Sequence, residues 1–133
     1  MLNVEHIGIA VKNLETSIPL FEKLLNKACY KTEVVETEKV QTAFFKTGET
    51  KIELLQATAA ESVIAVFIEK RGEGIHHIAF EVENIYDEVK SLQQQGFVFV
   101  NEIPKKGADN KLVCFLHPKS TNNLLIELCQ QIK

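Results

Sequence analysis

Two histidines lie at matching places in two similar stretches of the chain. The segment VEHIGIAVKNL at residues 4–14 is echoed by IHHIAFEVENI at residues 75–85, and this alignment places His6 on His77. Each histidine lies in an apolar, strand-like run that is followed by a polar break and a helix-like segment. Neutral imidazole is the commonest side-chain ligand of metal ions in proteins. The pair therefore suggests a site to which each half contributes one ligand.

A second echo adds two carboxylates to these histidines. KIELLQ at residues 51–56 is repeated as LIELCQ at residues 125–130, which places Glu53 on Glu127. In each strand the glutamate points away from its apolar neighbours, and burying a carboxylate is costly unless it is paired, protonated or bound to a metal. Imidazole and carboxylate together suit Zn, Co, Ni, Mn or Fe. The sequence predicts one divalent metal ion per chain, with these ligands: His6, Glu53, His77 and Glu127.

The sequence gives less reason to assign a chemical role to the other two histidines, His76 and His117. A single histidine or glutamate in a strand is usually a hydrogen-bonded or surface residue, so the repeat is the evidence for a metal site. His76 shares a strand face with apolar residues, and we interpret it as structural or as a support for the ligands. His117 lies in LHPKST at residues 116–121. This segment is either a turn before the last strand or a loop that contacts substrate, in which case the candidate substrate-binding residues are Lys119, Ser120 and Thr121.

Composition limits the class of protein. The chain has 133 residues, 45 % of them hydrophobic and 25 % charged, which is typical of one globular domain. A net charge of −3 argues against nucleic acid or an anionic membrane as the main partner. Three cysteines without C-x-x-C spacing are expected to be buried, reduced thiols: Cys29, Cys114 and Cys129. We see no signal peptide and no membrane span, and expect a cytoplasmic protein.

Hydrophobic periodicity predicts the elements that position the candidate ligands. The first half reads as a strand, a helix with Pro19 as a possible kink or later start, and three strands, at residues 3–11, 14–26, 29–37, 39–46 and 51–56. A connecting helix is expected over 62–72. The second half repeats the order at residues 75–82, 84–95, 97–102, 111–117 and 123–130, with a polar loop at 103–110.

These elements define an α+β fold with an internal repeat. Two tandem βαβββ modules are expected to form a curved, mostly antiparallel sheet around a metal-binding cavity. The whole chain is predicted to be a single domain. Its parts are a first repeat over about 1–57, a connector over 58–72 and a second repeat over about 73–133.

With the repeat and the four ligands in place, the chain resembles the vicinal-oxygen-chelate (glyoxalase/bleomycin resistance/dioxygenase) superfamily. Within it, the resemblance is closest to the methylmalonyl-CoA epimerase family and covers essentially the whole sequence. The matching segments are EHIGIAV at 5–11, TKIELLQ at 50–56, GEGIHHIAFEV at 72–82 and VCFLHPKSTNNLLIEL at 113–128. The last two point most specifically to the epimerases.

The resemblance implies a particular isomerase. It would interconvert (2R)- and (2S)-methylmalonyl-CoA, as in propionate metabolism, by removing and returning the C2 proton through a metal-stabilised enediolate. It implies Co, Zn, Ni or Mn as the metal, an acyl-CoA as the substrate and a homodimer as the assembly. Some relatives carry an additional glutamate, proposed as a base, where this chain has Thr42. The candidate catalytic residues here are therefore Glu127, the stronger candidate, and Glu53.

Three alternatives remain open. A glyoxalase I-type lactoylglutathione lyase uses the same His/Glu/His/Glu set on a glutathione hemithioacetal, and the HPKST segment favours the epimerase over it. A metal-free protein that binds or sequesters a small molecule would keep the fold but lose the ligands, whereas this chain has all four. An extradiol dioxygenase needs two histidines and one carboxylate around iron. A fourth ligand at Glu53 argues against it.

Overall fold

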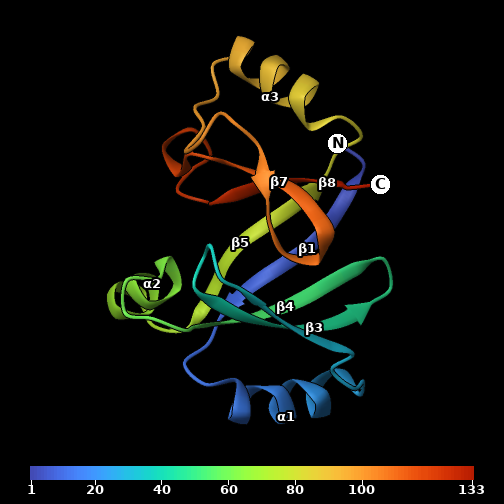
Figure 1. Ribbon diagram of the computed structural model, residues 1–133, viewed down its shortest axis with the longest axis vertical. Helices are drawn as coiled ribbons and strands as arrows, with labels where there is room; N and C mark the ends of the chain where they lie inside the picture. The colour runs from blue at the N-terminus through green and yellow to red at the C-terminus, as the bar shows by residue number, and fades with distance from the viewer. The chain divides into compact units, whose positions relative to one another are not determined.

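The protein is described by a computed structural model that covers residues 1–133 (Figure 1). The first half contains β1 (Asn3–Ala10), α1 (Leu14–Leu25), β2 (Lys31–Val35), β3 (Val40–Thr47) and β4 (Thr50–Ala57), and α2 (Val63–Arg71) follows. The second half contains β5 (Gly74–Glu81), α3 (Ile85–Gln94), β6 (Lys105–Lys106), β7 (Lys111–Leu116) and β8 (Ile126–Gln131). Two short 3₁₀ helices are η1 (Ala108–Asn110) and η2 (Pro118–Ser120). The predicted α+β class and the repeated βαβββ order are confirmed.

Hydrogen bonds link the strands in the order β2-β3-β4-β1-β5-β8-β7-β6. The pairs β1–β4 and β5–β8 are parallel. The pairs β2–β3, β3–β4, β6–β7 and β7–β8 are antiparallel, as expected for a mostly antiparallel sheet. The two parallel pairs join the histidine strand to the glutamate strand in each half. No helix is long and apolar enough to cross a membrane.

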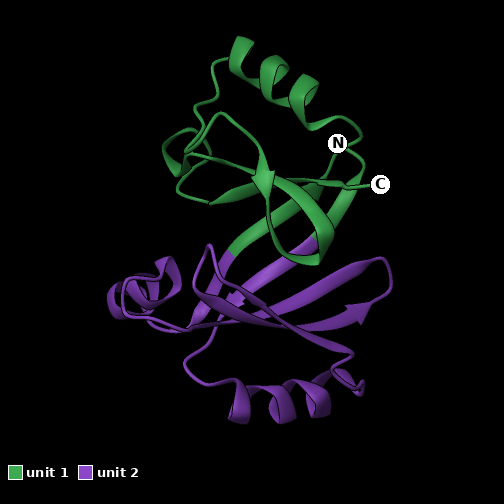
Figure 2. Ribbon diagram, viewed as in Figure 1, with its two compact units in different colours: residues 1–5, 77–133 green, residues 6–76 purple.

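The chain divides into two compact units (Figure 2). Unit 2 is residues 6–76, and unit 1 is residues 1–5 with residues 77–133. Strands β1 and β5 each contribute residues to both units. Within unit 1, the amide of Leu2, the residue before β1, donates a hydrogen bond to the carbonyl of Glu81 in β5 at 2.8 Å.

In unit 2, α1 packs on one face of β3 and β4 (Figure 1). Apolar residues at helical spacing in α1 meet alternating residues of these strands, and the Phe21 and Phe45 rings lie 6.4 Å apart. A second cluster contains the buried residues Ala10, Val40 and Leu55, with Ile64 from α2. The face of β3 and β4 that is opposite α1 is thus partly covered near α2.

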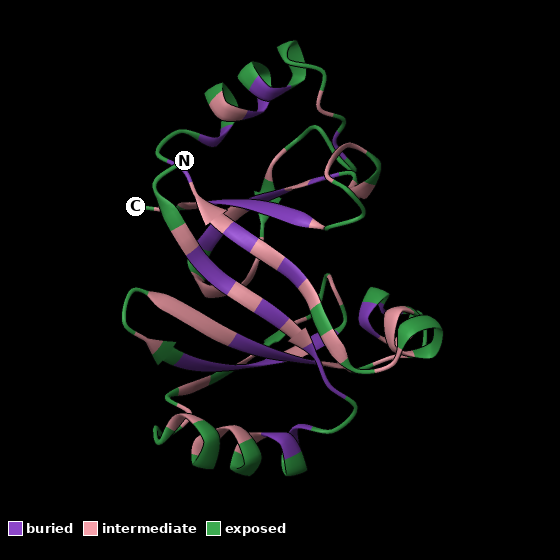
Figure 3. Cartoon of the chain, turned by 180° about the vertical axis from the view of Figure 1, so that it is seen from behind, coloured by how far each residue is buried: buried purple, intermediate pink, exposed green.

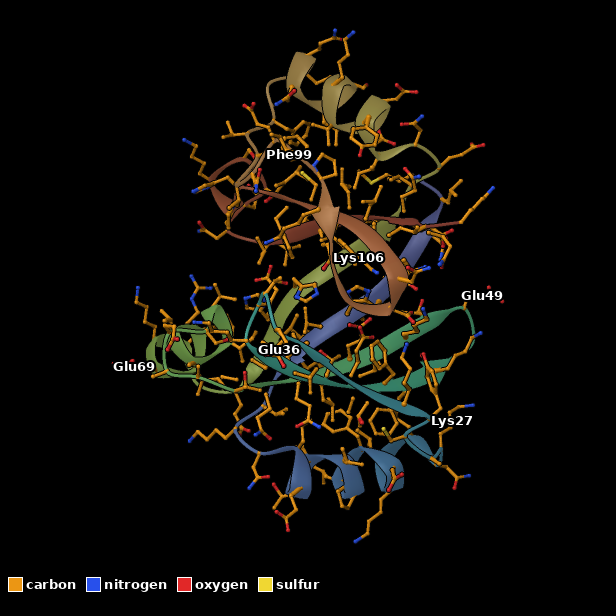
Figure 4. All side chains as sticks on the ribbon, viewed as in Figure 1. Lys27, Glu36, Glu49, Glu69, Phe99 and Lys106 are labelled. Carbon is orange, nitrogen blue, oxygen red and sulfur yellow. The ribbon has the colours of Figure 1, made fainter.

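In unit 1, α3 covers one face of β7 and β8 (Figure 1). The fully buried side chains of Ile85 and Leu128 belong to this core. Figure 3 shows that buried residues concentrate in the strands, whereas the helices expose their outer faces. Charged side chains such as Lys27, Glu49 and Glu69 are exposed and point away from the ribbon (Figure 4).

The repeated glutamine at the end of each glutamate strand holds the start of a helix. Gln56 Oε1 accepts a hydrogen bond from the Leu14 amide of α1 at 2.6 Å. Gln130 Oε1 accepts one from the Ile85 amide of α3 at 2.8 Å. First-turn amides have no partner within their own helix, so an outside acceptor stabilises the helix start. The repeated segment therefore contains a glutamine with a structural role as well as a candidate metal ligand.

An asparagine caps the start of both α1 and α3. The Asn13 side chain accepts from the Glu15 amide, and α1 begins at Leu14 with Pro19 in its interior. The suggestion that the helix starts later at Pro19 is therefore wrong. The Asn84 side chain accepts from two amides of α3.

Two expectations about the second half need correction. Residues 97–102 do not form a regular strand, and only Phe99 makes an isolated bridge, to Leu116. The Val98 amide lies 3.3 Å from Ser120 Oγ, so η2 takes the place of a strand partner there. The loop at 103–110 is not irregular throughout, since it contains β6 and η1.

Candidate metal centre

In unit 2 the first candidate pair forms between neighbouring parallel strands. Glu53 of β4 lies in register with Gly8 of β1, and His6 is two residues earlier on the same face. His6 Nδ1 lies 3.1 Å from Glu53 Oε2. Only 7 % of the His6 side chain and 5 % of the Glu53 side chain are exposed. The predicted histidine and glutamate of the first half are thus brought together in a buried setting.

Unit 1 repeats this geometry with the second pair. Glu127 of β8 lies in register with Ala79 of β5, and His77 is two residues before Ala79. His77 Nε2 lies 3.1 Å from Glu127 Oε1, with 6 % and 7 % of the two side chains exposed. The Phe115 ring meets the His77 ring edge-on, with centroids 5.9 Å apart. A small residue lies opposite each glutamate, Gly8 opposite Glu53 and Ala79 opposite Glu127, and leaves room on this face.

The chemistry of these pairs suits a metal ion better than it suits stability alone. A buried carboxylate beside a buried imidazole carries a large desolvation cost, and replacing such a pair with apolar residues is often neutral or stabilising. One carboxylate and one imidazole are first-choice ligands for a borderline divalent ion. Each pair supplies only two ligands, whereas zinc sites usually take at least three from the protein. The residues present therefore fit a divalent ion, and neither pair completes its coordination.

The cysteine nearest this set is not a nucleophile. Cys129 is fully buried on β8, two residues after Glu127. Burial raises the pKa of the Cys129 thiol strongly, and the negative charges of Glu127 and Glu5 raise it further. The thiol stays protonated near neutral pH and contributes packing.

All three cysteines are free thiols. Cys114 is buried, and its burial raises the pKa of its thiol to about 11. Cys29 is only half-buried, so the expectation of burial is wrong for this residue.

Sequence reasoning missed a buried ion pair in unit 1. Glu5 Oε2 lies 3.8 Å from Lys111 Nζ, with 6 % and 8 % of the two side chains exposed. Lys111 Nζ also donates to Gln131 Oε1 at 2.7 Å. The only signal in the sequence was one charged residue in each of two apolar strands. Their partnership spans 106 residues, so local pattern could not reveal it.

The remaining histidines have structural contacts. His76 is half-buried, and the Phe67 ring meets its ring edge-on, with centroids 5.0 Å apart. This agrees with a structural interpretation. His117 is exposed, and its Nδ1 accepts from the Lys119 amide at 3.1 Å, which caps η2.

The HPKST segment borders an open pocket in unit 1. The pocket has a volume of about 500 Å³ and is lined by Gln95–Val98 together with Lys119 and Ser120. Ser120 Oγ bonds to the carbonyl of His117 at 3.0 Å. Thr121 Oγ1 donates to the Leu124 carbonyl at 2.5 Å. The two hydroxyl groups therefore brace the loop, whereas the Lys119 side chain is exposed.

Residues 5–115 match the family model of the Glyoxalase/Bleomycin resistance protein/Dioxygenase superfamily. The chain belongs to this superfamily. It is similar to the Ethylmalonyl-CoA/methylmalonyl-CoA epimerase of Cereibacter sphaeroides, with 38 % identity over 129 residues that cover 96 % of each chain. It is also similar to the uncharacterized protein YqjC of Bacillus subtilis, with 37 % identity over 98 % of this chain and 93 % of that one.

Solved structures of epimerases share the fold closely. The methylmalonyl-CoA epimerase of Mycobacterium tuberculosis matches with a TM-score of 0.94 and 29 % identity, over 98 % of this chain and 89 % of that one. A methylmalonyl-CoA epimerase in complex with methylmalonyl-CoA and NH4+ matches with a TM-score of 0.92 and 27 % identity, over 98 % and 95 %. The resemblance to the epimerase family is thus confirmed.

Proposed function

We propose that the chain is a metal-dependent epimerase that interconverts (2R)- and (2S)-methylmalonyl-CoA. The observation that carries this proposal is the buried histidine–glutamate pair, repeated with the same 3.1 Å separation in each unit. The similarity to named methylmalonyl-CoA epimerases over nearly the whole chain supports the choice of substrate. A rearrangement at carbon needs no redox group, and the protonated buried thiols offer none.

We infer that the two pairs share one divalent ion. Two ligands from each unit give the four-ligand set His6, Glu53, His77 and Glu127, which suits cobalt, zinc, nickel or manganese. The equivalence of the two pairs in sequence and in local geometry supports a shared ion, because neither pair supplies enough ligands by itself. When bound, such an ion supplies Lewis-acid stabilisation of the negative charge that develops on the acyl oxygens.

The carboxylates are the groups on this chain suited to move the C2 proton. That proton is acidic because it lies between a thioester carbonyl and a carboxylate. Glu127 is the preferred base, and Glu53 is the candidate on the opposing face, since epimerisation returns the proton from the other side. His77 orients Glu127 through their 3.1 Å contact, and the dry surroundings exclude competing water.

Lys119 is the preferred contact for the CoA portion of the substrate. Its ammonium group is exposed beside the pocket next to η2, where it can meet a phosphate. Ser120 and Thr121 would act through the loop that they brace. We further expect a homodimer in the cytoplasm, and cobalt as an effective metal for reconstitution.

Exchange of the C2 hydrogen tests the proposal. The protein is stripped with a chelator, reconstituted separately with Co²⁺, Zn²⁺, Ni²⁺ or Mn²⁺, and incubated with methylmalonyl-CoA in D₂O. Mass spectrometry is expected to find metal-dependent deuterium at C2. Glu127→Gln should slow exchange by about 10²–10⁴-fold, the usual effect of losing a general base. Glu83→Gln, a change at an exposed carboxylate before α3, is the matched control and should exchange normally.

The outcomes separate the alternatives. Exchange at the wild-type rate in Glu127→Gln would contradict its role as the base. A wild-type protein that catalyses no C2 exchange with any of the metals, but that isomerises the methylglyoxal–glutathione hemithioacetal, would be identified as a lactoylglutathione lyase. A protein that binds no metal and catalyses neither reaction would identify a binding protein.

A further inference from the structure

Thr42 is a buried polar residue that lacks a hydrogen bond. Its side chain lies in β3 with 1 % of the residue exposed, and its Oγ1 makes no hydrogen bond. Most buried polar side-chain atoms in proteins have a partner, so an unpaired one calls for an explanation. Valine has nearly the same shape and would fill this position without the cost of an unpaired hydroxyl group. The presence of a threonine suggests that the hydroxyl group has a partner in another state of the protein.

The strand register places this hydroxyl on the same face as the first candidate pair. Thr42 lies directly across from Leu55 of β4, and Phe44 lies across from Glu53. Directly opposed residues share a sheet face, so Thr42 and Glu53 are diagonal neighbours on one face. Diagonal neighbours are separated by roughly 7–8 Å, a gap that a small group of a ligand can bridge. This is the face that carries His6.

The neighbours of Thr42 on this face are apolar except on the side of β2, where the half-buried Glu33 lies directly across from it. Val40 and Phe44 flank it on the same face of β3, and Leu55 lies opposite. These three side chains are buried and have no group that can accept or donate a hydrogen bond. A ligand that extends along this face from Glu53 would therefore reach the Thr42 hydroxyl group past the apolar side chains of Phe44 and Leu55.

We propose that the Thr42 hydroxyl group contacts the substrate and donates a hydrogen bond to an oxygen of the bound acyl group. This inference rests on the proposed function. The carboxylate and thioester oxygens of a methylmalonyl group are acceptors only, so the hydroxyl group must be the donor. Glu33 lies across from Thr42 on β2, but Thr42 Oγ1 makes no hydrogen bond to it. A threonine hydroxyl group is itself not a base near neutral pH, so it orients the acyl group and does not take the C2 proton. It thereby fixes which face of C2 is presented to Glu53.

Three variants test this role. Thr42→Val removes the hydroxyl group and keeps the shape, Thr42→Ser keeps the hydroxyl group, and Thr32→Val is the control. Thr32 is exposed on the other face of the neighbouring strand, across from Ala43. For each protein we would measure the thermal midpoint, the metal content, and kcat and KM in the C2 exchange assay.

The expected results distinguish a substrate contact from a structural role. Thr42→Val should melt at or above the wild-type temperature, because an unpaired buried hydroxyl group is removed, and it should bind the same amount of metal. Its kcat/KM should fall about ten- to hundredfold, the usual effect of losing a hydrogen bond to a charged group. Thr42→Ser should stay within about threefold of the wild type, and Thr32→Val should be unchanged.

Two results would overturn the inference alone. One is a wild-type kcat/KM in Thr42→Val, and the other is an equal loss in Thr42→Val and Thr42→Ser, which would indicate a packing effect. If the wild-type protein itself catalyses no exchange, the proposed function fails and this inference fails with it. The rate of the wild-type protein therefore separates the two failures.

Discussion

The buried pair His77–Glu127 predicts that losing one partner harms the metal-free protein more than losing both. His77 Nε2 lies 3.1 Å from Glu127 Oε1, and each side chain is less than 8 % exposed. His77→Leu leaves a buried carboxylate without its partner, which costs about 3–5 kcal/mol. Glu127→Leu leaves a buried imidazole, which costs about 1–3 kcal/mol. The double variant leaves neither group unpaired, so its stability should lie within about 1 kcal/mol of the wild type or above it.

Urea unfolding in the presence of a chelator measures this cycle. Independent effects would add to about 4–8 kcal/mol, the sum of the two ranges above, so the double variant separates the two outcomes clearly. As a control, His77→Leu combined with a leucine at the exposed Glu83 should add within about 0.5 kcal/mol. Divalent metal should stabilise the wild-type protein and leave the double variant unchanged. Additive losses in the double variant would refute the assignment of a pair kept for ligand binding.

Two further predictions concern the fold. Asn84→Ala should lower the free energy of unfolding by about 0.5–2 kcal/mol, because two amides of α3 lose their acceptor. Asn84→Asp should keep the wild-type free energy of unfolding, because aspartate also caps helices well. Equal urea midpoints for the two variants would contradict the role of Asn84 as a cap. Burial raises the pKa of the Cys114 thiol from 9.0 to about 11, so this contribution to stability is complete below pH 9 and is lost as the pH rises toward 11. The slope is at most about 1.4 kcal/mol per pH unit, it should flatten in Cys114→Ala, and urea unfolding at pH 8, 9 and 10 measures it.

The sequence predicted the elements that carry the site because repetition is a strong signal. The two repeated segments placed each candidate ligand, two histidines and two glutamates, on a strand. The structure has the same arrangement, with Gly8 and Ala79 in register with the two glutamates. The helix starts predicted at residues 14 and 84 also lie within one residue of those observed, Leu14 and Ile85. These features depend on local pattern.

Features that depend on contacts between residues far apart in the sequence could not be predicted. The strand expected at residues 97–102 begins with four residues that favour strands, yet Ser120 lies against Val98 and the segment forms a single bridge. The ion pair Glu5–Lys111 and the unpaired hydroxyl group of Thr42 depend on which strands become neighbours. Alternation gives the face of a residue but not its partners across the sheet.

The stoichiometry of bound metal tests the central claim most directly. Protein loaded with Co²⁺ or Zn²⁺ and freed of excess ion is analysed by elemental mass spectrometry, as the wild type and as the variants His6→Leu and His77→Leu. A shared site predicts one ion per chain in the wild type and strong loss of metal in either variant, because each unit supplies two of the four ligands. Two ions per chain, or one variant that keeps its metal fully while the other loses it, would contradict a site shared by the two pairs.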